Sequence, residues 1–82
     1  MEGAVGDVRL VLASVVGRDV VDSLEDHESL FDRGIVDSLQ LVEIIDRFQE
    51  DFAIKVTGEE LSPENFGSIT GMANFLERRR AG

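Results

Sequence analysis

Hydrophobic residues recur at every third or fourth position in three stretches of the chain, which is the spacing of one face of an α-helix. The first stretch covers about residues 2–16 and stops before Gly17, the second covers 38–51, and the third covers 68–79. The most regular apolar stripe lies in the second stretch and consists of Leu41, Ile45, Phe48 and Phe52. The pattern therefore predicts three main helices.

The segments between these stretches have other patterns. Residues 18–37 lose the helical period and gain Asp, Ser and Gly, which predicts a long loop. We expect its apolar positions to enter the core; these are Leu30, Phe31 and Ile35. Residues 53–57 alternate like a strand, but a single strand cannot pair its backbone, so an extended loop is expected. Ser62 followed by proline predicts a short helix over 62–66.

Three main helices and one short helix predict an all-α fold, a small four-helix bundle. Its 82 residues suit one domain over 1–82, and the absence of cysteine means that packing alone must hold it together. Ser68 is expected to cap the last helix, and the residues after Arg78 are expected to fray.

The chain is strongly acidic, with 17 acidic and eight basic residues and a formal net charge of −9. This charge opposes binding to nucleic acids and anionic membranes and favours basic protein surfaces. The sequence shows neither a signal peptide nor an apolar run of membrane-spanning length. We therefore expect a cytoplasmic protein, monomeric, with protein partners.

Ser38 stands where the long loop meets the most regular helix, and this position exposes its hydroxyl group. The free N–H groups and the positive dipole end of a helix N-terminus favour a phosphate there. The alternative is that Ser38 or Asp37 only caps the helix, and Asp37 with Gln40 three residues later fits a capping box.

The side of this helix opposite the apolar stripe mixes exposed apolar residues with acids. A helical wheel places five residues there, namely Leu39, Val42, Glu43, Asp46 and Glu50. Scattered exposed apolar residues are common on protein surfaces. Beside an exposed serine, however, the group indicates a docking face with apolar contacts for grip and carboxylates that attract basic partners.

The motif Gly34-x-x-Asp37-Ser38-Leu39, followed by Val42-Glu43, resembles the attachment motif of acyl and peptidyl carrier proteins. The resemblance implies that a phosphopantetheinyl transferase joins 4'-phosphopantetheine from coenzyme A to Ser38, flanked by Asp37 and Leu39. Asp37 would serve transferase recognition, and Mg²⁺ would be held mainly by the transferase and the cofactor phosphates, so no metal site is expected here. The arm's thiol would carry an acyl or aminoacyl thioester, so the chain is a carrier and not an enzyme.

The resemblance also implies further partners, an acyl- or aminoacyl-loading enzyme and a downstream transferase or synthase. Gln40, where fatty-acid carriers commonly have an acid, and the stretch 61–69 favour a discrete carrier of polyketide or nonribosomal peptide biosynthesis, including antibiotics. A D-alanyl or fatty-acid carrier is the alternative. Phe66 is expected to flank the arm and contribute to docking, unless it only fills the core.

The residues leave three rival functions to compare with a carrier. Asp32 and Glu43 occupy the first and twelfth positions of a possible EF-hand loop, but its interior lacks the required oxygen ligands and turn glycine. An enzyme would need a base, and the single histidine, His27, lies in an acidic loop without a nucleophile motif. A helical interaction module without an arm stays open, because only the setting of Ser38 distinguishes it.

Overall fold

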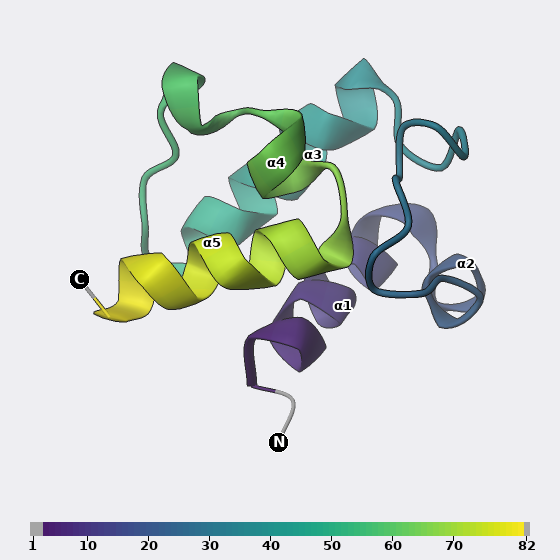
Figure 1. Cartoon of the computed structure of the whole chain (residues 1–82), viewed down its shortest axis with the longest axis horizontal. Coiled ribbons are helices and arrows are strands. Elements are labelled where there is room, and N and C mark those ends of the chain that lie inside the picture. Colours follow the sequence, from purple (N-terminus) through teal and green to yellow (C-terminus); the bar gives the residue numbers. More distant parts are fainter. Residues whose placement is uncertain (1–2, 82) are drawn as a thin grey trace.

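A computed structural model describes residues 3–81 of the chain, and in this range it contains helices and no strand. The elements are α1 (Gly3–Val16), α2 (Arg18–Asp22), α3 (Ser38–Phe52), η1 (Gly58–Glu60), α4 (Pro63–Phe66) and α5 (Ile69–Ala81) (Figure 1). The all-α fold and its three main helices are confirmed. Residue 2, where the first helix was expected to begin, lies outside the described range.

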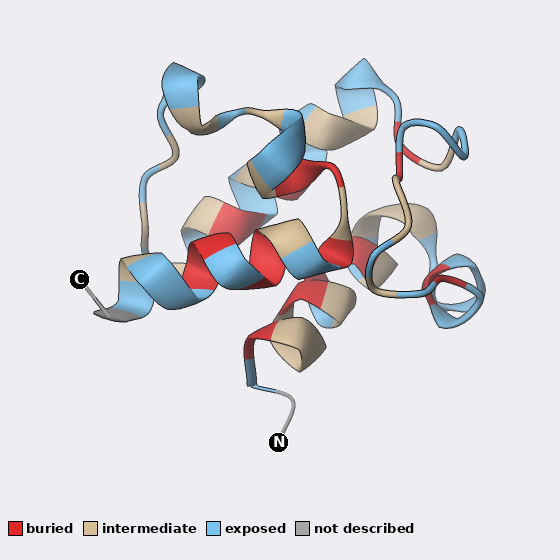
Figure 2. Cartoon of the chain, in the orientation of Figure 1, coloured by how far each residue is buried: buried red, intermediate tan, exposed pale blue. Residues whose placement is uncertain are grey.

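The three main helices pack around one hydrophobic core, with α1 contacting both α3 and α5. Figure 2 shows the buried residues gathered where these helices face one another. The core consists of Ala4, Val8, Val11, Leu12, Val21, Leu24, Leu30, Val36, Ile44, Phe48, Phe66, Ile69, Met72, Ala73, Phe75 and Leu76.

Helix α3 buries a slightly different face from the one predicted. Phe48 is fully buried as expected, but Ile44, which the predicted stripe left out, is equally buried. Leu41, Ile45 and Phe52 are only partly buried and pack at the edge of the core. The buried face is therefore rotated toward Ile44, because α3 faces α1 on one side as well as the aromatic side chains of α4 and α5 on the other.

The segment 18–37 was predicted to be a continuous loop. It begins instead with the five-residue helix α2. Gly17 separates α1 from α2 with a φ of 102°, which an L-residue rarely adopts. Leu30 is buried and Ile35 is partly buried, but Phe31 is 39% exposed, so the prediction that it enters the core is wrong.

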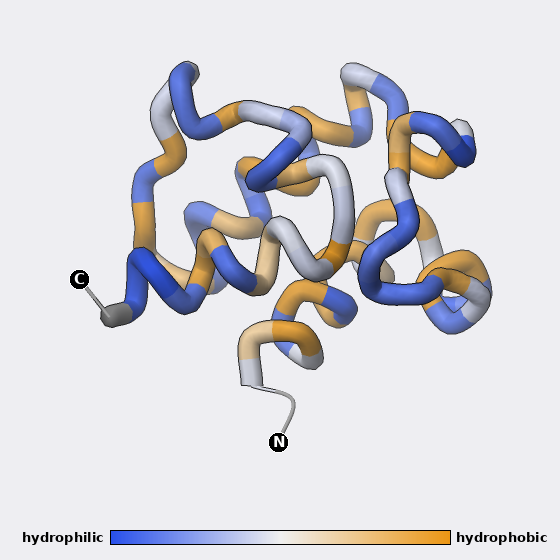
Figure 3. The backbone as a smooth tube through the Cα atoms, in the orientation of Figure 1, coloured by the Kyte–Doolittle hydropathy of each residue, from blue (hydrophilic) through white to orange (hydrophobic). Residues whose placement is uncertain are grey.

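Residues 54–57, which follow α3, are extended, as predicted, and hydrophobic and hydrophilic positions alternate along them (Figure 3). Ile54 and Val56 pack against the core. Ala53 ends α3 in the left-handed conformation, with a φ of 54°. Ser62 caps α4 by accepting a hydrogen bond from the backbone N–H of Asn65, with proline at the first turn.

Helix α5 begins after Ser68, whose Oγ accepts a hydrogen bond from the backbone N–H of Gly71. The helix continues to Ala81, although the residues after Arg78 were expected to fray. Arg79 forms an ion pair with Glu60 at 3.0 Å, and Arg80 pairs with Asp7 at 2.7 Å. Arg80 also lies over the ring of Phe52, so the end of α5 is tied to three other parts of the chain.

Candidate attachment site and docking face

Ser38 is the first residue of α3, and it is exposed. The cap of the helix is made by its neighbour: Asp37 Oδ1 accepts from the backbone N–H of Gln40 at 2.8 Å. In return, Gln40 Oε1 accepts from the backbone N–H of Asp37 at 3.2 Å, which completes the predicted capping box. Capping is thus done without the Ser38 hydroxyl group, which stays available at the surface.

The backbone before Ser38 is held by one hydrogen bond to a distant part of the chain and by a hydrogen-bonded turn within the loop. The N–H of Leu30 donates to the carbonyl of Gly67 at 2.8 Å, and the carbonyl of Leu30 accepts from Ile35 at 2.9 Å. Gly34 makes the turn between them with a φ of 71°, in the left-handed region that favours glycine. The loop therefore delivers Ser38 to the helix start in a defined position.

The first turn of α3 suits a phosphodiester on Ser38. The N–H groups of Ser38 and Leu39 have no partner within the helix, as in every helical first turn, and the dipole of this 15-residue helix is positive at this end. The exposed hydroxyl would place a phosphate group beside these donors. When bound, 4'-phosphopantetheine supplies a thiol that forms thioesters.

The exposed side of α3 holds the five residues predicted for docking. Leu39 is 74% exposed and Val42 is 56% exposed, so two apolar side chains lie at the surface within about one helical turn of Ser38. Glu43, Asp46 and Glu50 are exposed beside them on the same helix. We call these five residues the α3 face.

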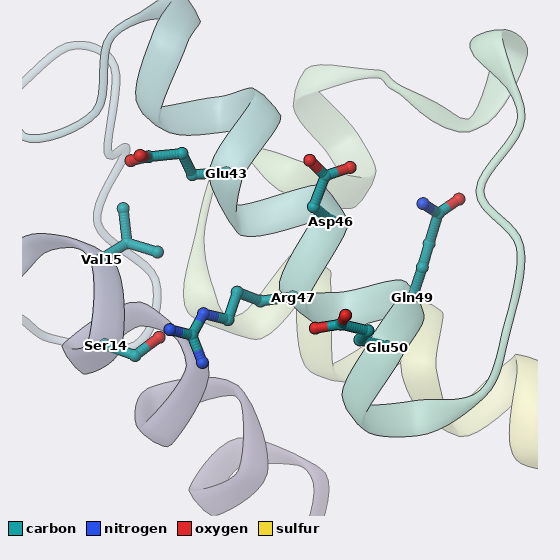
Figure 4. Close-up of a pocket in the computed structure, with 7 residues that line it drawn as sticks. All are labelled: Ser14, Val15, Glu43, Asp46, Arg47, Gln49 and Glu50. Carbon is teal, nitrogen blue, oxygen red and sulfur yellow. The ribbon is translucent and has the colours of Figure 1, made fainter.

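The α3 face borders a groove of about 810 Å³ between α3 and the end of α1. Figure 4 shows Arg47 extended across this groove toward Ser14, with Glu43 and Glu50 to its sides. Among residues 3–81, Arg47 has no acidic partner within 4.0 Å. Arg47 was not predicted to belong to this surface, although its spacing of four residues from Glu43 and three from Glu50 indicates a shared side.

Phe66 does not belong to this surface. Its side chain is 1% exposed, and its ring packs at 5.4 Å from Phe48 and 5.2 Å from Phe75, measured between centroids. The expectation that Phe66 contacts partners is corrected accordingly, because a side chain in the aromatic core has no surface to offer them. Its ring instead fixes α4 to α3 and α5.

The described part of the chain shows no cluster of side chains for metal binding or for catalysis by His27. No three His, Cys, Asp or Glu side chains within residues 3–81 lie close enough to hold a metal ion. His27 is exposed, with its Nε2 3.6 Å from Glu25. None of the described helices is both long enough and apolar enough to span a bilayer.

Comparison with known proteins identifies the class to which this geometry belongs. Residues 7–76 match the family described as phosphopantetheine attachment site, and the match spans most of the chain. The chain therefore belongs to this family of carrier proteins, which are not catalysts and whose prosthetic group is covalently attached 4'-phosphopantetheine. The family interacts with phosphopantetheinyl transferases and with biosynthetic enzymes.

One relative is named as a carrier of acyl groups. The chain is 27% identical to the probable acyl carrier protein PigG of Serratia sp. (strain ATCC 39006) over 60 residues. The aligned region covers 73% of this chain and 69% of that protein.

Proposed function

We propose that Ser38 is the residue that carries the 4'-phosphopantetheine arm, and that the chain is a discrete carrier of acyl or aminoacyl thioesters. The observation that carries this proposal is that Asp37 caps α3, so the hydroxyl group of Ser38 stays exposed and free of the cap. In the transfer, Ser38 Oγ forms the new bond to phosphorus and loses its proton, and adenosine 3',5'-bisphosphate leaves coenzyme A.

The α3 face serves as the surface that partner enzymes recognise. Leu39 and Val42 flank Ser38 on the exposed side of the helix and offer apolar contact area. The carboxylates beside them attract basic enzyme surfaces and speed the encounter. The same surface would be used in turn by the transferase, by the enzyme that loads the cargo and by the transferase or synthase that accepts it.

The pathway we propose is polyketide or nonribosomal peptide biosynthesis. The name of PigG as a probable acyl carrier protein supports a carrier role. Gln40 supports a discrete carrier outside fatty-acid synthesis, because fatty-acid carriers commonly have an acid at this position. Intact mass of the protein isolated from its own cells would give the mass of the cargo, and a long fatty-acyl series would contradict this pathway. Chiral analysis of alanine released from the arm would show whether it is D-alanine, which would also contradict it.

Attachment is tested by intact mass after incubation with coenzyme A, Mg²⁺ and a broad-specificity phosphopantetheinyl transferase. We expect a gain of one phosphopantetheine, located on the peptide that contains Ser38. Ser38→Ala should gain nothing, whereas Ser23→Ala, a change at another exposed serine, should load like the wild type. Loading of Ser38→Ala, or no loading of the wild type by two unrelated transferases, would overturn the proposal.

A further inference from the structure

Helices α1 and α2 enclose an open hollow that lies outside the proposed attachment site and its docking face. Helix α2 packs against α1 (Figure 1), and the volume of the hollow between them is about 230 Å³. None of its lining residues belongs to the α3 face. We call it the Leu10 hollow, and its lining consists of Gly6, Arg9, Leu10, Ala13, Arg18, Val21 and Asp22.

Arg9 fixes the two walls of the Leu10 hollow to each other. Its guanidinium group donates to the backbone carbonyls of Val21 and Leu24, each at 2.9 Å, and pairs with the Asp26 carboxylate at 2.6 Å. Each of these bonds joins α1 to α2 or to the residues that follow α2. The hollow is therefore preformed, and the charge of Arg9 is balanced within the chain.

Leu10 is the residue of this hollow that packing within the chain does not explain. Its side chain is 62% exposed, although another side of α1 forms part of the core. Gly6 and Ala13, four residues before it and three after it, lie on the same side of α1 and leave space beside it. The surface combines a projecting apolar side chain with room for another, since cavities of ~150 Å³ hold a benzene molecule.

Arg18 and Asp22 carry unpaired charges at the rim of the hollow. They are exposed and four residues apart on α2, a spacing at which opposite charges can pair. Within residues 3–81, however, neither has an oppositely charged group within 4.0 Å. Their order is the unfavourable one, because the arginine lies at the positive end of the helix and the aspartate at the negative end. Both charges are therefore available to another molecule.

The signs of these charges favour a second copy of the chain as that molecule. An acidic or a basic partner would be attracted by one of the two charges and repelled by the other. Two copies with a net charge of −9 each repel one another over most of their surface, so they approach most readily where local charges balance. A two-fold symmetric contact, which places the same patch on both copies, meets this condition at the Leu10 hollow.

We propose that the Leu10 hollow is the contact of a weak symmetric dimer of this chain. Arg18 of each copy pairs with Asp22 of the other. Leu10 of each copy packs beside Gly6 and Ala13 of the other. With seven lining residues a side, against roughly 20–30 in a stable interface, the association is transient. The inference goes beyond the proposed function, because it brings two copies of the attachment serine into one particle in place of the monomer expected from the sequence.

Sedimentation velocity of the whole chain tests the proposal, over roughly 1 μM to 1 mM, the range of weak complexes, and at about 0.15 M salt. We expect the mean mass to rise toward that of a dimer as the concentration rises. Ser38→Ala should associate like the wild type, because the contact does not need the arm. A monomer at every concentration would overturn this inference and leave the proposed function as it stands.

Substitution of Leu10 tests the apolar part of the contact. Leu10→Ser should weaken the dimer at least about tenfold, because both copies lose an apolar side chain from the contact. Val20→Ser is the matched control, since Val20 is an apolar residue of α2 that is 37% exposed but does not line the hollow. An unchanged dimer for Leu10→Ser, or equal weakening by both substitutions, would overturn the inference.

Exchange of the two charges tests the pairing between copies. Arg18→Asp leaves two acids at the rim and Asp22→Arg leaves two arginines, so each variant alone should dimerise at least about tenfold more weakly than the wild type. An equimolar mixture of the two variants should associate again, because the acids of one then meet the arginines of the other. Mixing could not repair a folding defect, so a mixture that stays monomeric would overturn the proposed contact.

Discussion

Gly71 allows α5 to pack closely against α4. A Cβ atom at this position would overlap the carbonyl oxygen of Glu64, so the helices could not approach this closely with any other residue. Alanine stabilises an ordinary helix interior by about 1 kcal/mol relative to glycine. Here we expect Gly71→Ala to lower the free energy of unfolding by about 1–3 kcal/mol through overpacking.

A urea titration followed by circular dichroism measures this change. Gly58→Ala is the control, because nothing lies within 4 Å of the Cβ it would add. If Gly71→Ala stabilised the protein instead, the close contact between α4 and α5 would be wrong.

The cap of α3 gives a second prediction for single residues. Asp37→Ala removes the acceptor of the Gln40 N–H and should cost about 1 kcal/mol of unfolding free energy, the usual value for an N-cap. Asp37→Asn should keep most of the stability, because asparagine caps equally well. Ser38→Ala should change it by less than about 1 kcal/mol, since Ser38 does not make the cap. A loss at Ser38 as large as that at Asp37 would contradict this assignment.

Contacts of single residues could be predicted from the sequence where both partners are close together in the chain. The capping box was predicted because Asp37 and Gln40 are three residues apart and interact locally. Phe31 and Phe66 were misplaced because both are equally hydrophobic, and only the path of the loop relative to α4 buries one and exposes the other. Ile44 was missed because the choice of buried face depends on which helices pack on either side of α3.

At the scale of the elements, Glu60 joins η1 to α5 through its ion pair with Arg79. The backbone N–H of Thr57 donates to Glu60, and with the nearby Arg79 guanidinium it holds the pKa of Glu60 below its ordinary value of 4.5. Because the folded pKa is lower than the unfolded one, Glu60 stabilises the fold above pH 4.5. This contribution is lost as the pH falls through the folded pKa.

We therefore expect Glu60→Gln to make the stability of the protein less dependent on pH below 4.5 than that of the wild type. Urea midpoints measured at neutral pH and across the acidic range for both proteins test this. Glu59→Gln removes the same charge from the adjacent exposed side chain and is the matched control. Parallel curves for Glu60→Gln and wild type would exclude the coupling.

The elements differ in how well the sequence predicted them. The main helices carry long periodic patterns, so their existence was predicted and their described ends differ from the predicted ones by no more than two residues. Helix α2 was missed because five residues are too few to show a period. The end of α5 was expected to fray because its partners, Asp7 and Glu60, are far away in sequence and only the fold brings them close.

At the scale of the whole molecule, the α3 face predicts which substitutions slow loading by the transferase. Val42→Ser removes apolar area from the α3 face without touching the core, and we expect kcat/KM of the transferase for this carrier to fall about fivefold, or ~1 kcal/mol. Val20→Ser on α2 is the control and should load at the wild-type rate. Equal effects of the two changes would show that partners do not contact the α3 face.

The net charge of −9 adds a dependence on salt. Association with basic partners should slow as ionic strength rises, because salt screens charges separated by more than about 8 Å at physiological concentration. Glu43→Gln combined with Asp46→Asn should reduce this dependence, measured as the slope of the loading rate against salt. An unchanged slope would place the attracting charges elsewhere on the molecule.

The hydrogen bonds from Leu30 to Gly67 and from Thr70 to Asp26 cannot form until late in the synthesis of this domain. Ser38 emerges during synthesis before Gly67 and Thr70 do, so the loop that positions it stays without its anchors until the last third of the chain has appeared. A transferase that reads the folded shape is therefore expected to modify Ser38 only after residue 70 has left the ribosome. A chain cut before residue 67 should load more slowly than residues 1–82, which a loading assay on the truncated protein would measure.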